Sequence, residues 1–409
     1  MYDNTATYET IKHRSRLHVP TAPKEHTEQP TVNDCFENFI VSTERVFEIL
    51  GKSPTGKVTF EQSEQGDARR QLLHVEKVAI ENKRLQRTSE ASYIESISYQ
   101  LHDIIVEEMS EYLKDTPGVI SNLLKLPSNI GMLLDSLTVR ACSVSKLEPI
   151  VATMPWLVDD LTRIVNTARF RRKDSRGRII IVETLRTALS FLGIENLRLL
   201  IPSLIVKRAT PQITDPYPLI KQKLSSYSTG VAITAQHIAI AQGINKSDAY
   251  MLGMLGNLGR CAVIRLYFRM FDKVQLHLLQ ECQKDKEQKR HDALVKIVPS
   301  ANHLIALQHT FADALTADVL DELALKRLFI TPAMRAVAGS SHAQPSVLSD
   351  TLSQARLYAQ VRALHQTKLT DAKTAKSTLS ALKYPQGILA KLKNIDIFTL
   401  PLVKSDAED

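Results

Sequence analysis

The stretch that decides the fold reads ETLRTALSFLGIENLR and covers residues 183–198. Apolar residues recur at helical spacing from Ile181 to Leu192, and a second helical pattern runs over 195–206. Gly193 separates the two patterns, and glycine can cap a helix in a left-handed conformation because it lacks a Cβ atom. The sequence therefore predicts two packed helices joined by a turn at Gly193.

The same helical pattern continues outward along the chain. Ser145 and Glu148 have the spacing of a capping box, and Pro155 stands at the first turn of the next predicted helix. Residues that favour helix are plentiful, whereas glycine, which turn-rich β architectures need, is scarce at 14 of 409 residues. We therefore expect an all-α fold, with further helices over 219–242, 247–271, 273–286, 291–308, 311–328, 332–339, 347–366 and 370–382.

Proline, glycine and charge divide the chain into four parts. Residues 1–32 are polar and lack an apolar period, so we expect a flexible tail. Residues 33–115 form a helical module, which ends at the Asp-Thr-Pro-Gly sequence of 115–118. A denser helical domain covers 116–343, and a helical extension with an acidic tip covers 344–409.

Charge and cysteine content bear on the compartment and the partners. The net charge is +8, but 44 acidic residues are mixed with 52 basic ones, which is typical of a solvated basic surface. The four cysteines include no close pair, so no zinc ribbon or disulfide framework is expected. We see no signal peptide and no apolar run near the roughly 18 residues that span a bilayer. We expect a cytoplasmic protein that does not bind membranes.

Several short motifs follow one another along residues 126–341. They are Leu126-Pro127, Met154-Pro155, Asn166-Thr167, the stretch around Gly193, and GMLGNLG at 253–259. Together they resemble the HDOD domain, an HD-related output domain of bacterial signalling proteins. The resemblance implies a multi-helical, HD-like bundle with flanking helical segments, and a role in signal transduction. It also identifies Asn166 and Gly193 as structural motif residues, and the Asn166 amide can cap backbone groups at a helix end.

The resemblance also shows which metal ligands are missing. HD-type phosphohydrolases hold metal ions with a histidine, a His-Asp pair and further histidines or aspartates. The first histidine falls at Tyr227, the His-Asp pair at Gly256 and Asn257, and the late histidine pair near Ser340 and Ser341. Glycine and serine cannot replace an imidazole, and a neutral asparagine is a poor substitute for a metal-bridging aspartate. We therefore expect a degenerate HD site with no catalytic residue, no metal ligand and no cofactor.

Three glycines recur every three residues in the GMLGNLG segment. Gly253, Gly256 and Gly259 lie in a helical pattern, so they are predicted to share one helix face. Each costs about 1 kcal/mol relative to alanine inside a helix. Close approach of a neighbouring helix would compensate for this cost. A ligand lying against the bare backbone is the alternative.

A basic loop spans residues 169–178. Its cationic side chains could grip a phosphodiester or a cyclic dinucleotide, and the plain alternative is a solvated, mobile loop. Phe170 is the single aromatic residue of the loop, so base stacking is limited and a nucleic-acid partner is disfavoured. The candidate anion-binding residues are Arg169, Arg171, Arg172, Lys173, Arg176 and Arg178.

Three classes of function stay open on these observations. The first is a non-catalytic signal-transduction or scaffold protein that binds a protein partner through its degenerate HD-like domain. The second is a metal-dependent phosphohydrolase with rearranged ligands, whose candidate histidines are His237, His303, His309 and His342. The third is nucleic-acid binding through the basic loop, with an affinity that falls steeply with salt. Retained packing motifs beside lost metal ligands favour the first class.

Overall fold

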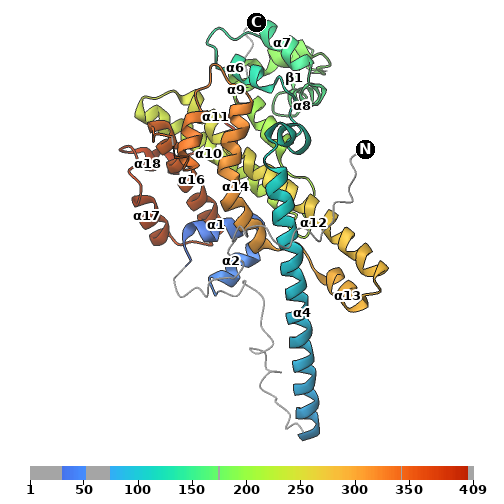
Figure 1. The fold of residues 1–409 in the computed structure, drawn as a ribbon. Helices are drawn as coiled ribbons and strands as arrows, with labels where there is room; N and C mark the ends of the chain where they lie inside the picture. Colours follow the sequence, from blue (N-terminus) through green and yellow to red (C-terminus); the bar gives the residue numbers. More distant parts are fainter. Residues whose placement is uncertain (1–29, 52–73, 174–175, 342, 404–409) are drawn as a thin grey trace.

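The computed structural model describes residues 30–51, 74–173, 176–341 and 343–403 (Figure 1). These residues are almost entirely helical, with one short two-stranded hairpin, so the predicted all-α fold class is confirmed. The predicted tail over 1–32 lies almost wholly outside the described residues, and so does the acidic tip after residue 403.

The N-terminal part consists of two short helices and one long one. Helix α1 (Val32–Val41) begins with a capping box between Thr31 and Asp34, and α2 (Thr43–Ile49) follows. Helix α4 (His74–Tyr112) is continuous over 39 residues. Its C-terminal half buries Ile97, Leu101, Ile105 and Met109, while its N-terminal half extends away from the body (Figure 1).

The first half of the central domain packs short helices on a long one. Helix α9 (Leu185–Ala209) is broken at Gly193, which has φ 72° and ψ 156°. The expected positive φ is present, but this ψ lies in the extended region open to glycine alone rather than in the left-handed helical region. Around α9 lie α6 (Ile130–Thr138), α7 (Val144–Ala152) and α8 (Pro155–Val165). The short α5 (Thr116–Gly118) contacts α14, and the π-helical turn η3 (Val119–Leu123) contacts α12.

A hairpin precedes the helix predicted from Ile181, and residues 181–184 are neither helix nor strand. Strands β1 (Arg172–Lys173) and β2 (Ile179–Ile180) pair antiparallel, and the helix begins only at Leu185. The expectation of helix over 181–184 is therefore wrong. The physical reason is that both backbone polar groups of Val182 bond to the side chain of Asn166, which leaves neither for a helical ladder.

The second half of the central domain is built around two helix pairs. Helix α10 (Ile220–Gln242) packs against α11 (Lys246–Leu255) and α16 (Val347–Gln366), and α12 (Leu258–Lys284) packs against α14 (Ala301–Glu322). Two shorter helices, α13 (Gln288–Lys296) and α15 (Thr331–Val337), cover the ends of these pairs.

The chain breaks between α11 and α12 at Gly256 and Asn257, so the three glycines do not share one helix face. A Cβ atom on Gly253 would lie 2.7 Å from the Cα atom of Ala232 in α10. A Cβ atom on Gly259 would lie 2.1 Å from the carbonyl oxygen of Ala312 in α14. Close helix approach is therefore present, but it involves two different neighbouring helices.

The C-terminal part returns to the central domain. After α17 (Ala372–Ser380) and α18 (Ile388–Lys393), the chain runs back to α9, where Val403 exchanges two hydrogen bonds with the Asn196 side chain at 2.6 and 2.9 Å. One apolar cluster includes buried residues from Cys35 to Ile397. Helices of the predicted 33–115 and 344–409 segments thus share a core with those of 116–343.

Helix α9 is also long and apolar enough to cross a membrane by length and composition. This qualifies the expectation that no stretch approaches that length. Of its most apolar window, 56% is buried inside the protein, and its buried residues pack on α7 and α8. A helix in the core of a protein domain shows burial of this kind.

Candidate functional site

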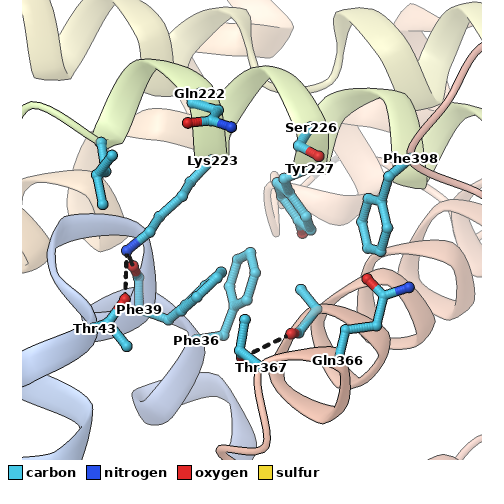
Figure 2. Close-up of a pocket in the computed structure, with 12 residues that line it drawn as sticks. Phe36, Phe39, Thr43, Gln222, Lys223, Ser226, Tyr227, Gln366, Thr367 and Phe398 are labelled. Carbon is cyan, nitrogen blue, oxygen red and sulfur yellow. Dashed lines mark hydrogen bonds between the residues drawn. The ribbon is translucent and has the colours of Figure 1, made fainter.

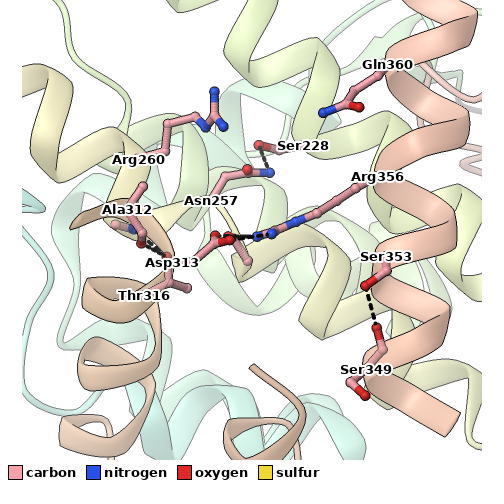
Figure 3. Close-up of polar contacts among 12 residues, drawn as sticks. Ser228, Asn257, Arg260, Ala312, Asp313, Thr316, Ser349, Ser353, Arg356 and Gln360 are labelled. Carbon is pink, nitrogen blue, oxygen red and sulfur yellow. Dashed lines mark hydrogen bonds and ion pairs between the residues drawn. The ribbon is translucent and has the colours of Figure 1, made fainter. Parts of the chain in front are cut away.

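The positions of the first histidine and of the His-Asp pair meet in space. Tyr227 lies on α10 and is 3% exposed, and Asn257, at the α11–α12 junction, is also 3% exposed. The side-chain amide of Asn257 donates to the hydroxyl of Ser228, next to Tyr227, at 3.2 Å (Figure 3). Two of the positions that the resemblance aligns with HD metal ligands therefore lie close together in the fold.

An arginine from α16 reaches into this junction. The guanidinium of Arg356 donates to both carboxylate oxygens of Asp313 at 2.9 Å, and to the carbonyl oxygen of Gly256 at 2.9 Å (Figure 3). Its side chain is 16% exposed, whereas that of Asp313 is 43% exposed. A fixed positive charge thus lies against the backbone of the residue that takes the place of the HD histidine.

A second arginine–carboxylate pair also lies near Tyr227. Arg260 on α12 donates to both oxygens of Glu37 on α1, at 2.5 and 2.9 Å. Glu37 is 2% exposed and the Arg260 side chain 15% exposed, so this fork-shaped pair is buried. It fastens α1, from the start of the described chain, onto the central domain.

Tyr227 itself is held as a neutral phenol between these two pairs. Burial raises its pKa to about 12, against the opposing effect of Arg356 and Arg260. The ring of Phe36 packs on it with a centroid distance of 4.5 Å. A divalent cation entering here would meet one neutral amide, one neutral phenol and two carboxylates that are each already paired with a guanidinium group, which does not fit the set of free carboxylates and imidazoles that metal ions need.

The other predicted HD positions lie elsewhere. Ser340 and Ser341 follow α15 in a turn with local hydrogen bonds, from Ser340 N to Arg335 O and from Ala343 N to Ser340 O. The described contacts do not join this turn to Tyr227 or Asn257. His342 lies outside the described residues.

The candidate histidines are not gathered into one site. His237 lies on α10, His309 is exposed on α14, and His303 is stacked on His102 of α4 with ring centroids 4.1 Å apart. Burial lowers the pKa of His303 to about 4, and the neighbouring His102 adds to this shift. Across the described parts of the chain, no three His, Cys, Asp or Glu side chains are close enough together to hold a metal ion.

The structural motif residues have local partners. The Asn166 amide donates to Thr162 O at 3.0 Å and to Val182 O at 2.8 Å, and its oxygen accepts from Val182 N at 2.9 Å. Arg198, close after Gly193, donates to the carbonyl oxygens of Leu137 and Val139 at the end of α6. These contacts tie α6, α8 and the hairpin to α9.

The predicted anion-binding loop is the β1–β2 hairpin. Arg169 donates to the carbonyl oxygen of Leu402 at 2.7 Å, and Arg171 donates to Asn166 O at 3.1 Å. Arg172 and Lys173 form β1, and Arg176 and Arg178 are exposed beyond it. Arg169 and Arg171 are thus engaged with the protein's own backbone.

A pocket lies beside the degenerate HD site (Figure 2). It has a volume of about 290 Å³ and is bounded by α1, α10, the end of α16 and the segment that carries Phe398. Tyr227 and Lys223, one helical turn apart on α10, both line it. The pocket and the site therefore share a wall.

Sequence reasoning missed the residues that fill the site, namely Glu37, Arg260 and Arg356. Each has its partner on a helix that lies far away in the sequence, so no local spacing identifies the pair. One feature of the sequence could have identified Glu37. Glu37 stands between Phe36 and Phe39 on the apolar face of α1, and an acidic residue in that position needs a buried counter-charge.

Comparisons with known proteins give one family. The chain is similar to the HDOD domain over residues 123–299. It is also similar to the crystal structure of the MmoQ response regulator from Methylococcus capsulatus strain Bath, at 18% identity and a TM-score of 0.29. That alignment covers 64% of this chain and 94% of the other. No curated protein matches the sequence.

Proposed function

Residues 123–299 are an HDOD domain, and from this premise we propose that the protein is a non-catalytic component of signal transduction that binds a protein partner. The match to the HDOD domain supports a signalling role. The binding of a protein partner is our own proposal. The chain offers a helical body in which both flanking segments are packed onto the domain.

The proposal of a non-catalytic role rests on the observation that two arginine–carboxylate pairs fill the degenerate HD site. The site holds the pairs Arg260–Glu37 and Arg356–Asp313 in a closed arrangement. A bidentate arginine–carboxylate pair occupies a lone pair on each carboxylate oxygen and holds a fixed positive charge beside it, which disfavours a metal cation at either carboxylate. Freeing Glu37 for a metal would leave a buried guanidinium without its counter-ion, which costs several kcal/mol.

The test begins with metal content and hydrolysis. Full-length protein is purified without chelators, its divalent metals are measured by plasma mass spectrometry, and phosphodiesters are offered with added Mn²⁺. We expect metal well below one ion per chain and no turnover above that of an Asp313→Asn variant prepared with the same tag and purification. Stoichiometric metal that is lost in Asp313→Asn, together with hydrolysis lost in the same variant, would replace this proposal with the phosphohydrolase alternative.

The partner is tested separately. Full-length tagged protein is expressed in its native cells, crosslinked, and purified against a tag-only control. A candidate then has to rebind as a purified protein and give a defined stoichiometry by light scattering. Absence of any stoichiometric complex across growth conditions would count against the partner-binding role, whatever the metal assay gives.

A further inference from the structure

The pocket beside Tyr227 has walls of aromatic rings. Phe36 and Phe39 of α1, Tyr227 of α10 and Phe398 all line it (Figure 2), and the Phe36 ring packs directly on that of Tyr227. Polar side chains of Gln222, Ser226, Gln366 and Thr367 also line it. Apolar walls with a few polar groups are the usual make-up of a small-molecule site.

One cation lies within these walls. Lys223 donates from its Nζ atom to the carbonyl oxygen of Phe39 at 2.5 Å and to the hydroxyl of Thr43 at 3.2 Å. The same Nζ atom lies 4.4 Å from the centre of the Phe39 ring. An ammonium group has three N–H donors, and both of these acceptors are neutral. The side chain therefore retains a donor and an uncompensated part of its charge.

The surroundings disfavour this charge in the absence of a ligand. Burial lowers the pKa of Lys223 to about 8, and Glu44 opposes this only in part. A lysine whose charge is poorly solvated gains more from an anion than a surface lysine does, because little water has to be displaced.

The volume limits the size of the ligand. About 290 Å³ is at the lower end of the range for small-molecule sites, enough for one ring with one acidic group. A cyclic dinucleotide is too large to be enclosed. The aromatic rings favour a flat apolar portion, which can stack on them.

We propose that this pocket binds a small organic anion with one planar ring, with the ring against the aromatic side chains that line the pocket and the acid on Lys223. The site is distinct from the basic hairpin and does not depend on the protein partner proposed above. Because Phe36 and Phe39 belong to α1, the ligand contacts the same helix that supplies Glu37.

The experiment uses phenyl phosphate, and benzyl alcohol as its uncharged analogue, titrated into full-length protein by calorimetry. We compare wild type with Lys223→Met and with the matched control Lys221→Met, which removes an exposed lysine two positions away on the same helix. We expect phenyl phosphate to bind at least about tenfold more weakly to Lys223→Met and with unchanged affinity to Lys221→Met. Benzyl alcohol should not distinguish the three proteins.

A second variant guards against a folding artefact. Ser226→Phe fills the pocket from α10 without touching the lysine, so it should abolish binding of both ligands while the thermal midpoint stays close to that of wild type. Equal phenyl phosphate affinity in wild type and Lys223→Met would overturn the proposal. So would the absence of saturable binding to wild type at millimolar concentration.

Discussion

Glu37 and Arg260 form a buried ion pair between residues 223 positions apart in the sequence, with two hydrogen bonds at 2.5 and 2.9 Å. The pair lies near Tyr227, which the sequence resemblance aligns with the first metal-binding histidine of HD-type phosphohydrolases. The Glu37 carboxylate and the Arg260 guanidinium thus fill space in which a cation would have to bind.

Removing one partner of this pair should be costly, and removing both should not. We expect Glu37→Leu to lower the free energy of unfolding by about 3–5 kcal/mol, because Arg260 is left buried and charged. The double variant Glu37→Leu/Arg260→Met should recover most of this loss. Urea unfolding of the four proteins of the cycle measures the coupling, and additive effects of the two changes would contradict the buried pair.

The Arg356 fork should not tolerate lysine. Arg356→Lys keeps the charge but cannot contact Asp313 twice and Gly256 O at once, so we expect a loss of about 1–2 kcal/mol. Amide exchange at the α11–α12 junction should also become faster. The control is Arg327→Lys at an exposed side chain, for which both measurements should match wild type.

Gly259 should be intolerant of even one methyl group. Gly259→Ala places a Cβ atom 2.1 Å from a backbone oxygen and 2.7 Å from the Thr316 backbone nitrogen, so α12 and α14 have to separate. We expect a loss of at least about 3 kcal/mol, in the range of severe overpacking. Gly339→Ala is a useful comparison, because it has open space and only an unfavourable φ of 72°, at a cost of about 1 kcal/mol. Equal effects of the two changes would argue against close packing at Gly259.

The stacked histidines should make stability depend on acid pH. The folded-state pKa of His303 is about 4, lowered from 6.5, so between these values the unfolded chain binds more protons than the folded one. Stability is then lost as pH falls through this window and is constant above it. The groups facing the ring are His102 and Tyr99 of α4, and the pKa of His102 is also lowered by burial.

His303→Phe keeps the stacked ring and removes the titration. We expect thermal midpoints of this variant to fall less between pH 6.5 and 4 than those of wild type. His309→Gln, an exposed change on the same helix, should follow the wild-type curve. A His303→Phe curve that coincides with wild type would show that other groups set the acid limb.

Helix positions followed from the sequence where apolar periodicity was strong, as in α10 and α16. The helix start at Leu185 did not, because a side chain from α8 competes for the backbone of Val182, and this competition depends on tertiary contact. The break at Gly256 and Asn257 was likewise hidden, since apolar spacing continues across it. The sequence alone indicated which aligned positions carry no metal-ligand side chain. Arg260 and Arg356 could be identified only once it was known which helices are in contact.

The packing of α1 and α16 onto the central domain bears on how the protein is dissected. A fragment limited to residues 123–299 retains Arg260 but lacks Glu37, Asp313 and Arg356. Such a fragment would expose the Arg260 guanidinium without its counter-ion, together with the apolar surfaces that α1 and α16 cover. It would be prone to aggregate, or to bind anions at a guanidinium that Glu37 occupies in the intact protein. Binding measured with the truncated fragment would then reflect the surfaces that truncation exposes and not the binding properties of the intact protein.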